Sequence, residues 1–226
     1  MELRCTFLAN CGVLLEAGES SVLIDAPNCE HTLFDGVPQE EAEKMAAAEA
    51  PYGGLCGLFF THRHSDHYDR KRVRQITDRR PGLTVFSPNG MTPSSGAVQA
   101  GPFSVRYASI LHSGEEFAGV FHRVLLVTVG ERMLYFTGDA DWNAQAHLSA
   151  LDGAMPDAIF CNPNLLSHPD GRELLRMCGR VFVCHLPEKA EDTLGIGRKA
   201  RTCLRRYGEE LPQLTLVEHY PTTFTV

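Results

Sequence analysis

Residues 55–67, which read LCGLFFTHRHSDH, decide the fold of this chain. Residues 55–61 form a continuous apolar run, which predicts a β-strand buried on both faces. Residues two apart on an extended segment face the same side, so His62 and His64 can bind one metal ion together. Where the chain then turns, Asp66 and His67 can face a second ion. Imidazole nitrogens and carboxylate oxygens suit zinc and similar divalent metals.

Three more candidate ligands follow other predicted strands. His112 ends the strand near residues 105–111, Asp139 follows the run 133–138, and His185 ends the strand 181–184. Strand ends are where a rigid scaffold presents functional side chains to a cleft. A single histidine at a strand end is usually structural, but these residues together with the motif supply enough ligands for two ions.

Strands dominate the first third of the chain and then alternate with helices. Apolar runs between turn signals predict strands at residues 4–9, 12–16, 21–24, 55–61, 83–87, 103–110, 123–129, 133–137, 158–161, 181–184 and 214–218. Helices are expected at residues 39–50, 68–78, 172–178 and 197–207, with a short one after Asp141. This order predicts a layered α/β or α+β fold in one domain that covers residues 1–226.

Composition excludes several classes of protein. The chain has 226 residues, of which 43% are hydrophobic, and this is an ordinary globular composition. Its formal charge of −7 does not favour non-specific nucleic-acid binding. No apolar run is long enough to cross a bilayer, and the start lacks the pattern of a signal peptide. The eight cysteines are scattered without a C-x-x-C pair, which favours reduced thiols and a cytoplasmic protein.

With these residues in view, the sequence resembles the metallo-β-lactamase fold superfamily, whose signature is H-x-H-x-D-H followed by a later His, Asp and His. Leu23-Ile24-Asp25 also resembles an early strand end of that family, although Ala26-Pro27-Asn28 departs from the small residue and glycine that usually follow. The resemblance implies an α+β fold, a four-layer αββα sandwich with the metal site at one edge between two sheets.

The resemblance also implies a role for each candidate ligand. His62, His64 and His112 would bind the first metal ion, whereas Asp66, His67 and His185 would bind the second. Asp139 would bridge both ions, and Asp25 would support the metal loop from behind. The expected cofactors are two divalent ions, with zinc favoured and manganese or iron possible.

Two metal ions that lie side by side in such a site share a water molecule. The pKa of this water falls to about 7, so it supplies a hydroxide nucleophile. We therefore expect a metal-dependent hydrolase of a small-molecule ester, lactone, thioester or phosphodiester. Asp66 can orient the hydroxide and accept its proton, so Asp66 and Asp139 are the candidate catalytic residues. The oligomeric state is open.

Other residues are weaker candidates for substrate contacts. Asn162 and Asn164 can donate to an oxyanion, but Asx-turn chemistry beside Pro163 is the more common role. Residues 27–54 are expected to wall the cleft, and Lys189 is a possible contact for an anionic substrate. Two basic segments are expected to be solvated helix faces: residues 70–74 with Arg79 and Arg80, and residues 198–206.

Two alternative functions remain on the same fold. A mononuclear iron dioxygenase acting on persulfides keeps the same motif, with one iron held by the first histidine pair and Asp139. A non-catalytic, metal-stabilised binding protein is the other alternative. The expected partner is a small molecule, with nucleic acid and membrane not favoured.

Overall fold

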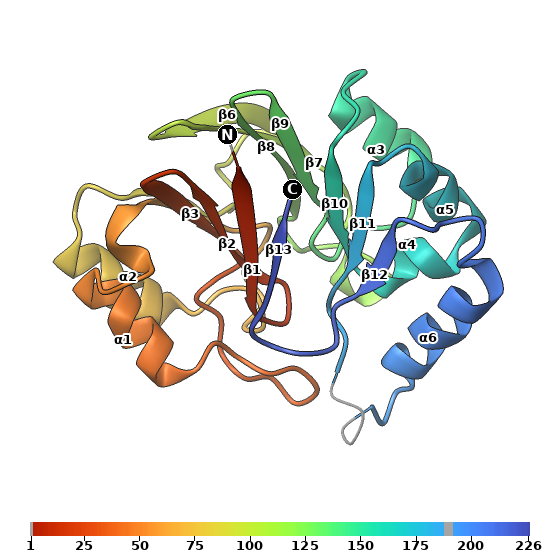
Figure 1. The fold of residues 1–226 in the computed structure, drawn as a ribbon, viewed down its shortest axis with the longest axis horizontal. Coiled ribbons are helices and arrows are strands. Elements are labelled where there is room, and N and C mark those ends of the chain that lie inside the picture. Colours follow the sequence, from red (N-terminus) through yellow and green to blue (C-terminus); the bar gives the residue numbers. More distant parts are fainter. Residues whose placement is uncertain (1, 188–191) are drawn as a thin grey trace.

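Two β-sheets pack face to face in the computed structural model, which describes residues 2–187 and 192–226 (Figure 1). The first sheet contains, in spatial order, β13 (Thr222–Thr225), β1 (Leu3–Ala9), β2 (Gly12–Ala17), β3 (Ser20–Ile24), β4 (Leu55–Phe59) and β5 (Thr84–Phe86). The second sheet contains β12 (Leu214–Leu216), β11 (Arg180–Val183), β10 (Ala158–Cys161), β9 (Arg132–Phe136), β8 (Arg123–Val129), β7 (Phe103–Ser109) and β6 (Ser95–Ala100).

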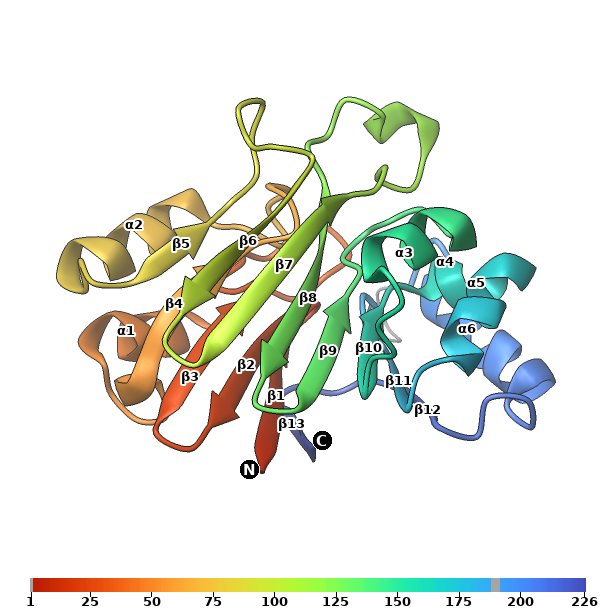
Figure 2. The ribbon, with the colours of Figure 1, turned by 90° about the horizontal axis from the view of Figure 1, so that it is seen from above.

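Helices cover the outer face of each sheet. The first sheet carries α1 (Gln39–Ala47) and α2 (Arg70–Arg79), at the left of Figure 1. The second sheet carries α3 (Ala144–Leu151), α4 (Pro163–Ser167), α5 (Pro169–Arg176) and α6 (Ile196–Tyr207), at the right. Figure 2 shows the same layers from above. The predicted four-layer αββα sandwich is confirmed.

Several element boundaries differ from the sequence prediction. Helix α1 ends at Ala47 rather than residue 50, because Ala48 adopts a left-handed φ of 57° that closes the helix. Helix α5 begins at Pro169 rather than residue 172, and the fixed φ of proline suits a first helical position. Strands β6 and β13 were not predicted. Their sequences, SGAVQA and TTFT, lack a strong apolar pattern because both strands lie at or near a sheet edge and are largely exposed.

Apolar side chains fill the space between the sheets. Phe7 of the first sheet packs against Phe160 of the second, with ring centroids 5.5 Å apart. Phe160 stacks between Phe136 at 4.3 Å and Phe182 at 5.2 Å. Two further buried clusters lie under α1 and α2 and under α3 to α6. Burial of apolar area in these three clusters, which lie between the four layers, is the main force that holds the sandwich together.

Strand direction places the candidate ligands. Strands β9, β10 and β11 are parallel, and β7 runs the same way because both β7 and β9 are antiparallel to β8. In the first sheet, β3 and β4 are also parallel. Segments that follow parallel strands leave the sheet at the same end of the strands. The predicted ligands of each sheet therefore gather at one end.

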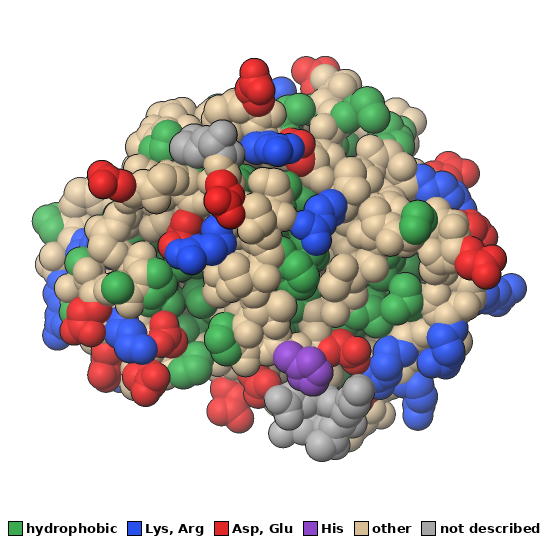
Figure 3. Space-filling model, viewed as in Figure 1, with side chains coloured by type: hydrophobic (Ala, Val, Ile, Leu, Met, Phe, Trp, Pro, Cys, Tyr) green, Lys and Arg blue, Asp and Glu red, His purple; other side chains and the backbone are tan. Residues whose placement is uncertain are grey.

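The two basic segments differ in their surroundings. On α6, the exposed Arg198, Lys199, Arg205 and Arg206 form a solvated face, at the lower right of Figure 3. Arg80, which follows the last residue of α2, instead donates from its guanidinium to the backbone carbonyls of Met45, Tyr52, Gly53 and Leu55. The expectation of a solvated face therefore holds for α6 and only in part for the segment from residue 70 to residue 80.

All eight cysteines have free thiols in the structure. Among the described residues, no helix has both the length and the apolar character needed to cross a bilayer.

Candidate metal centre

Seven side chains from both sheets form two adjacent clusters. Each member of a cluster offers one candidate ligand atom, and within a cluster these atoms all lie within 4.8 Å of one another. The first cluster contains His62, His64, His112 and Asp139, and the second contains Asp66, His67, Asp139 and His185. The structure thus brings together all seven residues that the sequence singled out, in the predicted grouping.

Asp139 lies between the two clusters. Its Oδ2 atom is 3.3 Å from Nε2 of both His67 and His112, and 3.6 Å from Nε2 of His62. Its Oδ1 atom is 3.1 Å from Nε2 of His185. One carboxylate therefore faces histidines of both clusters, which is the position that a bridging ligand requires.

Glycine at position 138 allows this placement. Gly138 adopts a left-handed φ of 49°, and a Cβ atom there would lie 2.5 Å from Oγ1 of Thr61 and 2.9 Å from Nε2 of His122. Only glycine accepts both this backbone conformation and this close approach. The end of β9 can therefore reach the end of β4 across the two sheets.

Asp25 orients two histidines of the centre. Its Oδ2 atom accepts a hydrogen bond from Nδ1 of His67 at 2.9 Å and another from the hydroxyl of Thr61 at 2.8 Å. Because the only hydroxyl proton of Thr61 is used in this bond, its oxygen accepts from Nδ1 of His62 at 3.0 Å. Both histidines therefore donate from Nδ1 and direct Nε2 into the centre.

His112 is fixed in the same way by a backbone carbonyl. Its Nδ1 atom donates to the carbonyl of Ser113 at 2.7 Å, which leaves Nε2 as the acceptor. The Nε2 atoms of His62, His67 and His112 are buried and have no hydrogen-bond partner among the described residues. Buried polar atoms without partners each cost about 1–3 kcal/mol. Coordination of metal ions would satisfy all three nitrogens, so these residues fit a dinuclear site.

The charges of the second cluster also suit a cation. Burial raises the pKa of Asp66, but the hydrogen bond from His185 and the charges of His67 and His185 outweigh it and lower that pKa to about 2. Burial lowers the pKa of His185, but the carboxylates of Asp139 and Asp66 outweigh it and raise that pKa to about 10. The negative charge that holds a proton on His185 would also favour a metal ion, and His185 would have to lose that proton to bind it.

Two residues of the centre hold strained backbone. Asp25 has a φ of 48° and His185 a φ of 62°, both in the left-handed region that non-glycine residues rarely adopt. Each such conformation costs of the order of 1–3 kcal/mol and persists only when the surrounding structure enforces it. Strain at both positions is consistent with a site that needs its side chains in fixed places.

His122 belongs to the surroundings of the centre, although it has no candidate ligand at a suitable spacing in the sequence. It is 1% exposed, its ring centroid lies 5.2 Å from that of His62, and its Nδ1 donates to the carbonyl of Ile110. Desolvation lowers its pKa to about 3, so its ring is neutral. No spacing signal could have identified it, because it reaches the centre from the start of a different strand.

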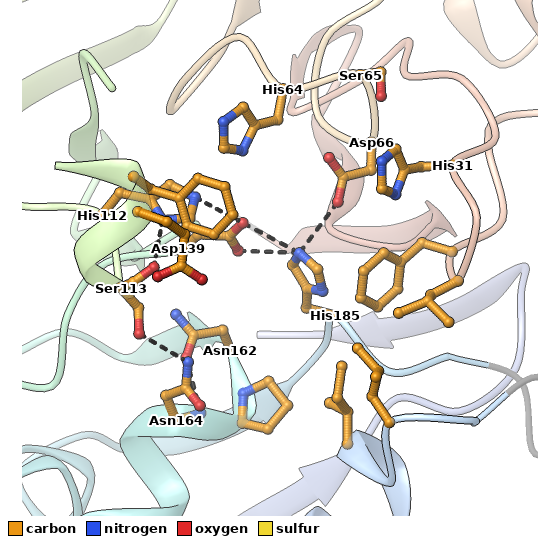
Figure 4. A pocket seen from close by; sticks show the side chains of 17 residues that line it. His31, His64, Ser65, Asp66, His112, Ser113, Asp139, Asn162, Asn164 and His185 are labelled. Atoms are coloured by element: carbon orange, nitrogen blue, oxygen red, sulfur yellow. Dashed lines mark hydrogen bonds and ion pairs between the residues drawn. The ribbon is translucent and has the colours of Figure 1, made fainter. Parts of the chain in front are cut away.

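A cavity of about 490 Å³ opens over the two clusters (Figure 4). His31, Leu33 and Phe34, which belong to the predicted cleft wall 27–54, line it, whereas residues 39–47 form α1 on the outer layer. Phe117, which the sequence did not single out, also lines it. Lys189 lies outside the described residues.

Of the two candidate asparagines, Asn162 has its amide nitrogen occupied. It donates to the carbonyls of Gly138 and Ala140, and its Oδ1 accepts from the backbone nitrogen of Asn164, where it caps α4. Asn162 thus holds the backbone around Asp139 in place. Asn164 instead donates its side-chain amide to the hydroxyl of Ser113 at 3.0 Å, and both residues line the cavity.

Comparison with solved structures identifies the fold. A possible metal-dependent hydrolase from Veillonella parvula superposes with a TM-score of 0.69 at 13% identity, covering 100% of both chains. Igni18, a metallo hydrolase from the archaeon Ignicoccus hospitalis, gives 0.67 at 13% identity, covering 100% of this chain and 99% of the other. The metallo-β-lactamase fold protein YhfI from Bacillus subtilis gives 0.65 at 13% identity, covering 100% of both.

These similarities show that the chain has the metallo-β-lactamase fold. No protein-family model matches the sequence, and no curated protein is significantly similar to it. At such low identity the likeness concerns the fold alone, and function has to be argued from the site.

Proposed function

We propose that the chain is a dinuclear metal-dependent hydrolase of a small molecule. The observation that carries this proposal is the pair of adjacent His/Asp clusters that share Asp139 and open into one cavity. His62, His64 and His112 would hold one ion, and the residues of the second cluster would hold the other. Asp139 would contact both.

The side chains have separate tasks in this proposal. A pair of divalent ions supplies a hydroxide nucleophile at neutral pH and polarises the bond under attack. Asp66 borders the cavity and is ionised, so its carboxylate can accept a hydrogen bond from the attacking water and orient it. Asp25 keeps His67 in the tautomer that a ligand needs. Asn164 and Ser113 can donate to the oxygen on which negative charge develops.

The bond and the metal remain part of the proposal. Ester, lactone, thioester and phosphodiester bonds are all open to this chemistry, and zinc is the favoured metal because of the imidazole-rich ligand set. We expect a small molecule rather than a polynucleotide, in keeping with the formal charge of −7.

Metal analysis of the purified protein tests the proposal. Protein expressed without added metal is assayed for metal content per chain and for turnover of generic ester, lactone, thioester and phosphodiester substrates. About two zinc or manganese ions per chain, with hydrolysis of one bond class, is the expected result. About one iron per chain with oxygen uptake would replace the proposal with the mononuclear dioxygenase. Stable metal binding with no turnover of any kind would favour the binding protein.

A further inference from the structure

The walls of the cavity differ sharply from its floor. The floor is formed by the polar side chains of the two clusters, whereas one wall is apolar (Figure 4). The apolar wall is defined here by five lining residues, which are Leu33, Phe34, Pro163, Leu194 and Ile196. Apolar walls with a few placed polar groups are typical of pockets that bind small organic molecules.

Phe34 is the residue of this apolar wall that packs against His185. Its ring meets that of His185 edge-on, with centroids 4.0 Å apart, and its side chain is only 8% exposed. Phe117 lines the cavity beside the other cluster, with its ring centroid 4.7 Å from that of His112 and 5.2 Å from that of His64. Apolar surface therefore lies directly beside the atoms that would carry out the reaction.

The segment that carries Phe34 is held in place by several hydrogen bonds. The guanidinium of Arg72 donates to the carbonyls of Asn28 and Val37 at the two ends of the segment, and the Asn28 side chain accepts from the Val37 backbone. At Gly36 a Cβ atom would lie 2.2 Å from the backbone nitrogen of Glu30, so the two arms of the segment touch. The wall is thus a preformed surface, which lowers the entropy lost on binding.

Several polar groups also line the cavity outside the two clusters and the apolar wall, and Ser113 and Asn164 are neutral ones. Ser113 accepts from the side-chain amide of Asn164, which leaves its hydroxyl proton and the second amide proton of Asn164 for a ligand. Outside the two clusters, Glu116 is the one ionisable carboxylate among the described residues that line the cavity, and none of these is Lys or Arg. The negative charge of Glu116 disfavours an anionic ligand at this position.

We propose that the cavity takes a small uncharged substrate with an apolar substituent. The apolar part packs on Phe34 and its neighbours in the wall, and the reacting polar group lies between the clusters and the Ser113–Asn164 pair. This inference rests on the proposed hydrolase function and deepens it. Among the open bond classes, it favours neutral esters, lactones and thioesters over phosphodiesters.

Binding of alkyl hydroxamic acids tests this inference without requiring turnover. Metal-loaded protein is titrated calorimetrically with unbranched members from acetohydroxamic to octanohydroxamic acid, and with one of equal length that ends in a carboxylate. The hydroxamate group chelates the metal ions, and the chain probes the wall. We expect affinity to rise roughly two- to fourfold per methylene until the wall is covered. The carboxylate-ended chain should bind more weakly than its neutral counterpart.

Variants separate the apolar wall from the polar pair. Phe34→Ala should flatten the dependence on chain length. Leu194→Ser should do the same, and because the Leu194 side chain is 70% exposed, this substitution removes little buried surface. Ser113→Ala should lower the affinity of all members by a similar factor, roughly fivefold to tenfold. Phe121→Ala is the matched control, because Phe121 is 53% exposed and does not line the cavity. Metal content is measured for every variant.

The outcomes distinguish this inference from the proposed function. If hydroxamates bind with an affinity independent of chain length, or if the carboxylate-ended chain binds best, the apolar substrate class is wrong while the metal centre stands. If no hydroxamate binds to protein that contains two metal ions, the accessible dinuclear centre is wrong as well. An unchanged chain-length dependence in both Phe34→Ala and Leu194→Ser would also overturn the assigned wall.

Discussion

Oδ2 of Asp25 lies 2.9 Å from Nδ1 of His67, and the two side chains are 2% and 0% exposed. Asp25 follows β3 and His67 follows the turn after β4, so this buried pair joins the ends of two neighbouring strands. The same carboxylate also accepts from the backbone nitrogen and the hydroxyl of Thr61. All of its contacts are with donors, and this determines how the centre responds to substitution.

Asp25→Asn should weaken metal binding at the second cluster roughly ten- to a hundredfold. In either orientation of the amide, its NH2 group faces a donor from which the carboxylate accepted a hydrogen bond, which is the Thr61 backbone nitrogen or His67 Nδ1. This repulsion disturbs the position of His67. Competition with a coloured chelator measures the affinity. Glu40→Gln is the control, because the side chain of Glu40 is 77% exposed on α1. Equal metal affinity in the Asp25 variant and the wild type would contradict the role given to Asp25.

Asp139→Asn should remove both activity and one or both ions. The substitution keeps the shape of the side chain but removes the negative charge that faces both clusters. Turnover should fall by more than about a hundredfold, beyond the loss typical of residues that only support a ligand. Metal content and turnover are measured together, with Asp152→Asn at the exposed end of α3 as the control. Turnover near the wild-type rate would exclude a bridging role for Asp139.

His122→Phe should affect the first cluster and not the second. The variant keeps a ring behind His62 but removes the donor to the Ile110 carbonyl, two residues before His112. The free energy of unfolding should fall by about 1–3 kcal/mol, and metal affinity at the first cluster roughly tenfold. Denaturant titration and chelator competition give the two values. Loss of stability with unchanged metal affinity would show that His122 serves the fold alone.

Arg72→Met should loosen the segment that carries Phe34. The variant keeps the apolar stem but removes the donors to Asn28 and Val37, which costs about 1–3 kcal/mol. Hydrogen exchange of residues 28–37 should become faster, and KM should rise more than kcat falls. Arg74→Met on the same helix is the control, since the Arg74 side chain is 81% exposed. Equal exchange in the two variants would contradict this account.

Much of the fold was predictable because its strongest signals are local. Buried strands such as β4 and β8 read as continuous apolar runs, and the ligands follow strand ends. The strand β6 was missed because an exposed edge strand obtains its stability from pairing with β7, and its own residues carry no apolar pattern. Helix α5 starts at Pro169, before the predicted start at residue 172. The prediction followed the apolar residues and did not take the proline as a first helical position.

By itself, the sequence determined the layered architecture and the seven residues that gather at the centre. Local periodicity predicts the order of strands and helices, and the spacing from His62 to His67 singles out the first four ligands. The other three adjoin predicted strand ends, and their grouping with the first four is what the resemblance to a known fold implies. Only the tertiary structure decided the orientation of the histidines by Asp25 and Thr61, the place of His122, and the apolar wall around Phe34. Those contacts join segments far apart along the chain, and packing between the two sheets, rather than any spacing, brings them together.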